Sequence, residues 1–113
     1  MEVTIRPMAV DDAPRVAGLA REAGYQAAPD EVGQRLRQLM LLPNQGLFIA
    51  RQRGETVGWA HVQGVLPLHA ASYAAVVGLV VRRPLRGQGI GQALLSSCRD
   101  WARANGFADL RLP

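Results

Sequence analysis

The chain has 113 residues, which is the length of one domain, because a second hydrophobic core could not be buried in so short a sequence. All thirteen basic residues are arginine, and the absence of lysine excludes a lysine-dependent phosphate loop, a Schiff base and a lysine general base. A net charge of +4, with scattered arginines and few aromatic residues, argues against nucleic-acid binding and leaves one local basic cluster at Arg82, Arg83 and Arg86.

The single cysteine, Cys98, allows neither an intramolecular disulfide nor a cysteine-rich metal site, so we expect no metal cofactor. The first residues lack the basic-then-apolar order of an export signal. The longest apolar run, at 74–81, is less than half of the roughly 18 residues that a membrane helix requires. We therefore expect a soluble cytoplasmic protein without nucleic-acid or membrane partners.

Residues 3–5 predict a short strand that ends at Pro7. After it, Asp11 and Asp12 are expected to accept hydrogen bonds from the first N–H groups of a helix. Gly24 suits the left-handed conformation that closes a helix. The spacing predicts that the buried face of this helix comprises Val16, Leu19, Ala20 and Ala23.

A second helix is predicted between Pro29 and Pro43, because proline suits the first turn of a helix and stops one that is already formed. Residues 47–51 and 56–62 then predict two strands, which the short connection at 53–55 joins into an antiparallel hairpin. The face of the second helix that is expected to be buried comprises Val32, Leu36, Leu39 and Met40.

Residues 73–81 are apolar on both faces, which is typical of a central strand covered on both sides. The glycine-rich segment 86–91 follows, and it leads into an amphipathic helix that ends near Asn105. Residues 107–112 predict a last strand. The inner stripe of the amphipathic helix is expected to comprise Ile90, Leu94, Ser97, Cys98 and Trp101.

The glycine-rich segment has the physical features of an anion site. A helix start exposes about four backbone N–H donors and carries the positive end of the helix dipole. Glycine at this position removes side chains that would keep a phosphate away from those donors. The segment is therefore expected to bind a group such as a pyrophosphate.

Several carriers of such an anion are compatible with a glycine-rich turn between a strand and a helix. A dinucleotide fingerprint read from Gly87 requires a small residue where Gln92 stands, and one read from Gly89 requires a small residue where Leu94 stands. The fingerprint therefore fails in both registers, although a nucleotide-binding module stays open as an alternative.

Arg86, Gly89 and Gly91 match the pattern Q/R-x-x-G-x-G/A, with an apolar strand before it and an amphipathic helix after it. The segment thus resembles the acetyl-CoA-binding motif of the GNAT superfamily of N-acetyltransferases. The order of elements also resembles the amino-terminal three quarters of that fold. The resemblance implies that residues 1–113 form a single α/β domain with a mixed, mostly antiparallel central sheet flanked by helices.

The resemblance also implies a cofactor site. The backbone of Leu79, Val80 and Val81 would pair with the pantetheine arm of CoA, and one N–H group there would polarise the thioester carbonyl. Arg82 or Arg83 would either reach a CoA phosphate or stay solvated in the loop. The backbone N–H groups implied to hold the CoA pyrophosphate are those of Arg86, Gly87, Gln88, Gly89, Ile90 and Gly91.

The implied reaction is direct attack of an amine, on a small molecule or a protein, on the thioester of acetyl-CoA. Because an alkyl ammonium has a pKa near about 10, a base must first remove a proton. Family members often place a glutamate on the central strand, but residues 73–81 contain no acid. The remaining candidates are His61, His69, Tyr73 or a bound water. The position of His61 on a strand favours a packed or hydrogen-bonded residue over a base, and that of His69 beside Pro67 favours a solvated loop residue.

Three other residues are expected to be structural or to line a cleft. Cys98 and Trp101 fall on the buried stripe of their helix, so packing is favoured over a nucleophilic role for the thiol. For Trp59 in the hairpin, core packing and the lining of a substrate cleft both stay open.

A complete family member continues past the strand predicted at 107–112. Its further elements commonly carry an asparagine near the cofactor and a tyrosine that can protonate the leaving CoA thiolate. Neither Tyr25 nor Tyr73 lies on a matching element. Three explanations are open: a fragment of a longer protein, a CoA-binding or interaction module without turnover, and a homodimer whose second subunit covers the last strand. We expect self-association in each case, because an exposed apolar strand edge is an association site.

Overall fold

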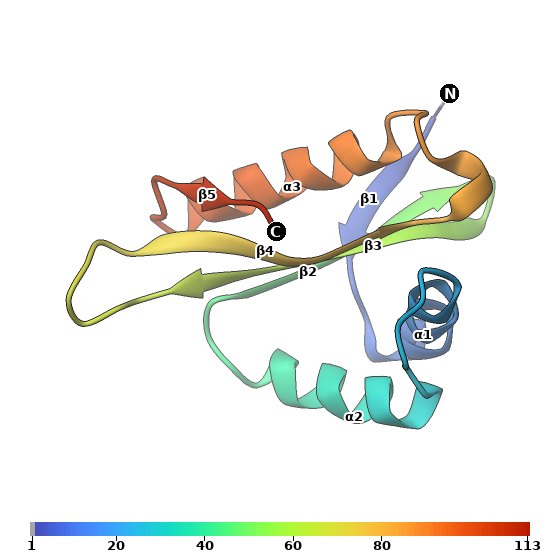
Figure 1. Cartoon of the computed structure of the whole chain (residues 1–113), viewed down its shortest axis with the longest axis horizontal. Coiled ribbons are helices and arrows are strands. Elements are labelled where there is room, and N and C mark those ends of the chain that lie inside the picture. The colour runs from blue at the N-terminus through green and yellow to red at the C-terminus, as the bar shows by residue number, and fades with distance from the viewer. Residues whose placement is uncertain (1) are drawn as a thin grey trace.

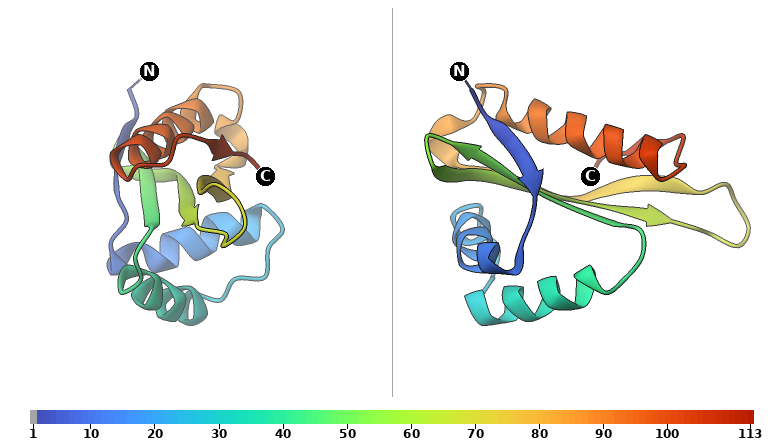
Figure 2. Two further views of the ribbon diagram at one scale, coloured as in Figure 1. Left: turned by 90° about the vertical axis from the view of Figure 1, so that its left-hand side faces the viewer. Right: turned by 180° about the vertical axis from the view of Figure 1, so that it is seen from behind.

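The computed structural model describes residues 2–113. A five-stranded sheet separates α1 and α2 on one face from α3 on the other (Figures 1 and 2). The strands follow the order β1-β2-β3-β4-β5, and all neighbours are antiparallel except β4 and β5. The elements are β1 (Thr4–Pro7), a short 3-10 helix (Val10–Asp12), α1 (Ala13–Glu22), α2 (Pro29–Met40), β2 (Gln45–Gln52), β3 (Glu55–Val65), β4 (Tyr73–Val81), a second 3-10 helix (Arg83–Leu85), α3 (Ile90–Ala104) and β5 (Leu110–Arg111).

The predicted mixed, mostly antiparallel sheet flanked by helices is therefore confirmed. Hydrophobic residues are buried on both faces of the sheet, and the core between the sheet and α3 is the larger of the two. Small and branched residues of β3 and β4 alternate towards this helix, as a half-buried strand requires. Leu95 and Ala102 are buried with the predicted stripe, whereas Ser97 and Trp101 are half-buried, so the buried face of α3 is wider than predicted. The other buried members of this core are Ala50, Val57, Ala60, Val62, Ala74, Val76, Ile90, Leu94, Cys98 and Phe107.

The opposite face of the sheet is covered by the pair α1 and α2. The predicted Val16, Leu19 and Ala20 are buried on α1, and Gly24 closes the helix with φ +97°. On α2 the prediction is partly wrong, since Met40 is exposed. The reason is that α2 packs on α1 and on the short 3-10 helix, and its last turn extends beyond both (Figure 1).

The start of α1 differs from the prediction in the role of Asp12. Its backbone is already helical, and its side chain makes no cap for α1. The carboxylate is buried and instead accepts hydrogen bonds from Ala9 N at 2.7 Å, Arg6 Nη2 at 2.8 Å and Arg15 Nη2 at 3.2 Å. Asp12 therefore ties β1 to the first helical turn.

The carboxy-terminal strand is shorter than predicted, because β5 contains only Leu110–Arg111 rather than 107–112. Phe107 turns inward before the strand begins, is buried, and stacks on Trp101 with ring centroids 5.9 Å apart. It lies over Gly64, where any Cβ atom would collide with the phenyl ring. Because of this inward turn, residues 107–109 do not join the strand, and only Ala74 and Ala75 of β4 have partners on β5.

Candidate functional site

The loop between β4 and α3 presents a run of unpaired backbone donors. Its first residues are folded, since Arg82 N donates to Val57 O at 2.8 Å and Arg86 N donates to Arg83 O at 3.3 Å. For the next six N–H groups, those of residues 87–92, no hydrogen-bond acceptor exists within the part of the chain that the structure describes. These donors lie at the positive end of α3, which is the arrangement that binds anions.

Glycine gives this loop both its shape and its openness. Gly87 and Gly89 have φ values of +83° and +90°, which L residues with a side chain rarely adopt. Apart from the adjacent residues, no atom of the described chain lies within 4 Å of the place where a Cβ would stand on either residue, and for Gly91 the nearest atom beyond its neighbours and its own helix backbone is Val81 Cγ2 at 3.8 Å. The residues present therefore fit a phosphate or pyrophosphate group, because the three glycines place no side chain over the amides.

The arginines beside this loop hold it in place. Arg82 Nη1 pairs with Glu55 Oε2 at 2.7 Å, which ties the loop to the β2–β3 turn. The backbone N–H of Arg83 donates to Glu22 Oε1 at 2.6 Å, and its guanidinium donates to the Glu22 carbonyl at 2.9 Å. Both side chains thus have protein partners at the end of β4, while Arg86 Nε donates to Val81 O at 3.2 Å.

The edge of β4 that faces away from β3 is open over half of the strand. Peptide groups of residues two apart in a strand point to the same edge. Since Arg82 N–H points to β3, so do the peptide groups of Val80, whereas those of Leu79 and Val81 point to the open edge. The bond between Arg86 and the Val81 carbonyl agrees with this alternation. The open edge leads directly to the segment with unpaired N–H groups at residues 87–92, which we call the donor loop.

A β-bulge sits in the middle of this edge. Gly78 pairs with His61 and Val76 pairs with Val62, so Val77 is the extra residue. Val77 is 50% exposed, which corrects the prediction that β4 is covered on both faces. The cover is missing because the α1–α2 pair stands away from the sheet there and leaves a cavity.

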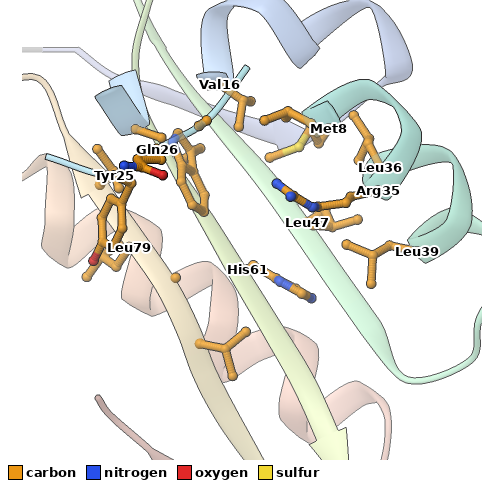
Figure 3. Close-up of a pocket in the computed structure, with 17 residues that line it drawn as sticks. Met8, Val16, Tyr25, Gln26, Arg35, Leu36, Leu39, Leu47, His61 and Leu79 are labelled. Atoms are coloured by element: carbon orange, nitrogen blue, oxygen red, sulfur yellow. The ribbon is translucent and has the colours of Figure 1, made fainter. Parts of the chain in front are cut away.

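The cavity has a volume of about 310 Å³, is open to solvent on one side, and is lined by residues of α1, α2, β2, β3 and β4 (Figure 3). Trp59 forms part of its wall and also packs with buried residues of α1. The residue therefore has both roles considered from the sequence, core packing and the lining of a cleft. The Trp59 ring lies over Gly78, because a Cβ at that glycine would stand 2.7 Å from the indole. Residues 77–80 of β4 also line the cavity, which places it beside the open strand edge.

His61 lies in the cavity wall, in a row with Leu47 and Gly78 across the sheet. Its Nε2 is 2.7 Å from Gln45 Oε1, which also accepts a hydrogen bond from Gln63. Because an amide oxygen only accepts, His61 carries its proton on Nε2 and leaves Nδ1 as an acceptor. Burial lowers the pKa of His61 below its ordinary value of 6.5, so the ring is neutral at pH 7.

The other two candidate bases lie elsewhere. His69 is exposed in the turn between β3 and β4, and Tyr73 is the first residue of β4, at the end of the strand remote from the donor loop. The Tyr73 ring is covered by the Arg111 guanidinium, whose central carbon is 3.6 Å from the ring centroid. Neither residue lines the cavity, so the structure brings only His61 to it.

Sequence reasoning missed the cavity residues that come from the helices and from the segment between them. Arg35 reaches from α2 towards the same space as His61 (Figure 3). Tyr25 and Gln26 contribute from the α1–α2 connection. In the sequence these three residues resemble ordinary surface positions, because nothing in their spacing indicates which neighbours the fold gives them.

Cys98 is fully buried in the core under α3, and burial raises the pKa of its thiol to about 11. The thiol is therefore protonated and unreactive at neutral pH, which confirms its structural role. No helix among residues 2–113 combines the length and apolar character needed to cross a membrane.

Comparison with known proteins defines the class. The family model of the acetyltransferase (GNAT) family matches residues 13–112, and the chain belongs to this family. No curated protein sequence matches the chain. The family and the fold class predicted from the sequence are thus both confirmed.

Solved structures of this class share the fold at low sequence identity. A GNAT family acetyltransferase from Staphylococcus aureus has a TM-score of 0.86 at 16% identity, over 100% of this chain and 87% of that one. Glucosamine-6-phosphate N-acetyltransferase from Arabidopsis thaliana has a TM-score of 0.85 at 13% identity, over 100% and 82%. An aminoglycoside N-acetyltransferase in complex with CoA has a TM-score of 0.85 at 17% identity, over 99% and 76%.

Proposed function

We propose that the protein is an N-acetyltransferase that uses acetyl-CoA to acetylate an amine of a small molecule or a protein, with residues 1–113 acting as one catalytic domain. The observation that carries this proposal is the continuity between the six free N–H groups at residues 87–92 and the open edge of β4. A pyrophosphate with an extended amide-containing arm matches both features at once. A neighbour of the same fold was solved with CoA, which supports the choice of this cosubstrate.

The proposed CoA site comprises the backbone amides of residues 87–92 and the strand end at Leu79 and Val81. Arg86 and Val80, which the sequence also suggested, are corrected, because Arg86 N–H donates to Arg83 O and the peptide groups of Val80 point to β3. The loop amides would bind the pyrophosphate, and the peptide groups of Leu79 and Val81 would pair with the pantetheine arm. Bound acetyl-CoA would supply an activated thioester. An N–H group on the open edge of β4 would donate to the carbonyl oxygen as charge develops on it.

His61 is the proposed general base. It is neutral at pH 7, its Nδ1 is free to accept a proton, and it lines the cavity beside the strand edge. Gln45 acts as a positioning residue, because its carbonyl oxygen fixes the tautomer that leaves Nδ1 unprotonated. His69 and Tyr73 are removed from the proposal, since neither reaches the cavity.

We propose further that the protein is cytoplasmic and forms a homodimer through the outer edge of β5. Within residues 2–113 this edge has no strand partner, and the adjacent Leu112 is 54% exposed. Analytical ultracentrifugation tests the dimer, because a Leu112→Glu variant should sediment as a monomer if this edge is the interface. An unchanged sedimentation coefficient in that variant would place the interface elsewhere.

A CoA-binding module without turnover is the second candidate. The observation that favours it is the scarcity of proton donors near the open strand edge, since within the described chain Tyr73 lies at the far end of β4, Cys98 is buried, and Tyr25 reaches the cavity only from the exposed α1–α2 connection. Such a module would keep the CoA site and lose only the chemistry.

Two measurements separate these candidates. Thermal unfolding with acetyl-CoA, CoA and NAD tests the binding site, and we expect both CoA species but not NAD to raise the melting temperature. Thiol release from acetyl-CoA with a panel of amines then tests turnover. Stabilisation with thiol release supports the enzyme, stabilisation without it supports the binding module, and the absence of stabilisation contradicts both.

A further inference from the structure

The cavity beside β4 is small and apolar. Its volume of about 310 Å³ lies at the lower end of the range for small-molecule sites. Most of its wall consists of aliphatic side chains and Trp59, which come from α1, α2 and three strands (Figure 3). An occupant of the size of a single aromatic amino acid fits this space, and the apolar wall disfavours a strongly polar molecule.

All nine acidic residues of the chain lie within residues 2–113, and none of them lines this cavity. A second or third ammonium group of a polyamine would lose its hydration in the cavity and gain no carboxylate in return. Four of the acids contact arginine groups away from the cavity, namely Asp12, Glu22, Glu55 and Asp109, and a fifth, Glu31, lies 3.9 Å from the guanidinium of Arg35 without lining the cavity itself. The other four, Glu2, Asp11, Asp30 and Asp100, do not line the cavity either.

Arg35 gives the cavity its one charged side chain. His61 is neutral at pH 7, so the guanidinium of Arg35 sets the sign of the charge there. Its contact with Glu31 is loose, at 3.9 Å between Nη2 and Oε2, and its side chain is 61% exposed. A guanidinium in this position is available to a carboxylate of the occupant, which it can bind through two parallel hydrogen bonds.

From this distribution we infer that the acceptor is a small apolar primary amine that also carries one carboxylate, and that Arg35 binds this carboxylate. The inference rests on the proposed function, because it names the substrate class of the proposed active site. The apolar skeleton would fill the space between Leu36, Leu47 and Trp59. The amine would approach Nδ1 of His61, which leaves the carboxylate on the side of α2.

Matched ligands test this inference by binding rather than by turnover. The probes are phenylalanine and (aminomethyl)benzoate, each compared with its carboxamide, together with spermidine as a polycation. Binding is followed through the indole N–H resonance of Trp59, with and without CoA, so the readout does not require catalysis. The variant is Arg35→Gln, and the control is Arg37→Gln, which lies on the same helix but outside the cavity.

We expect at least one carboxylate to bind about fivefold more tightly than its carboxamide, which is the upper range for a partly exposed ion pair. Arg35→Gln should abolish this preference, Arg37→Gln should retain it, and both variants should melt at the wild-type temperature. Equal affinity of acid and amide in both pairs, tighter binding of spermidine, a preference that survives Arg35→Gln, or no shift of the Trp59 resonance would each overturn the inference. Failure of the proposed function would appear separately, as loss of stabilisation by CoA.

Discussion

At the scale of single residues, the proposed chemistry depends on the protonation state of His61. Burial lowers its pKa, so the imidazole becomes the neutral base at a lower pH than an exposed histidine does. We expect kcat/KM to fall as the pH drops through this pKa, at a midpoint below 6.5. Replacement by alanine should remove this limb and lower kcat by about a hundredfold.

The control for His61→Ala is His69→Ala, since His69 is exposed and lies outside the cavity. The control variant should keep both the rate and the pH profile of the wild type. A pH limb that persists in His61→Ala would mean that another group accepts the proton.

The stability of the domain depends on a different residue, Asp12. Hydrogen bonds from Arg6 above all, with further ones from Ala9 N and Arg15, hold the pKa of its buried carboxyl well below the ordinary value of 3.8. A carboxyl whose pKa is lower in the folded than in the unfolded protein stabilises the fold above the unfolded pKa, and this contribution disappears as the pH falls towards the folded pKa.

Replacement of Asp12 by asparagine should therefore lower the free energy of unfolding at pH 7 by about 2 kcal/mol, the scale of a lost charge-assisted hydrogen bond. Urea denaturation between about pH 7 and pH 2 measures the effect, and the difference from the wild type should shrink below about pH 4. Asp11→Asn, at an exposed neighbour, should change the stability little. A difference that stays constant with pH would contradict the assigned role of the charge.

At the scale of elements, the connection between β4 and α3 contains the conformations that cofactor binding needs. Gly89 has φ +90°, and open space surrounds its Cβ position. We expect Gly89→Ala to cost about 1–2 kcal/mol of stability through the left-handed backbone, or to rotate the loop amides away from a common direction. Titration calorimetry with CoA should show affinity weakened by about tenfold or more.

Gly106 is a matched control, because it has φ +84° and equally open space but lies after the far end of α3. Gly106→Ala should lose a similar amount of stability and keep the affinity of the wild type for CoA. Equal loss of CoA affinity in both variants would show that the effect comes from destabilisation and not from the loop.

The elements also show where local pattern was sufficient. The continuous apolar run predicted β4 at residues 73–81, and the structure has the strand at the same residues. The last strand was predicted too long, because the pattern of 107–112 does not show that Phe107 is drawn onto Trp101 and Gly64. Asp12 was misread for a similar reason, since its partner Arg6 lies on another element.

At the scale of the whole molecule, the two halves of the site differ in how far the sequence predicts them. The donor loop is continuous in sequence, so a short motif that contains its glycines and the start of the helix is enough to predict it. The cavity is assembled from elements far apart in the chain, so Arg35 and Gln26 reach it only through tertiary packing. His61 was a candidate among several until the strand register, which pairs it with Leu47 and Gly78, placed it beside the bulge.

The central claim is that the free amides of residues 87–92 and the open edge of β4 together form one CoA site. Its most direct test is a titration of the protein with CoA, followed through the backbone amide resonances by NMR. The account predicts that the signals of residues 87–92, Leu79 and Val81 shift together with a single dissociation constant, and that NAD leaves them in place. CoA-induced shifts confined to other segments, or shifts in the loop without any in β4, would contradict it.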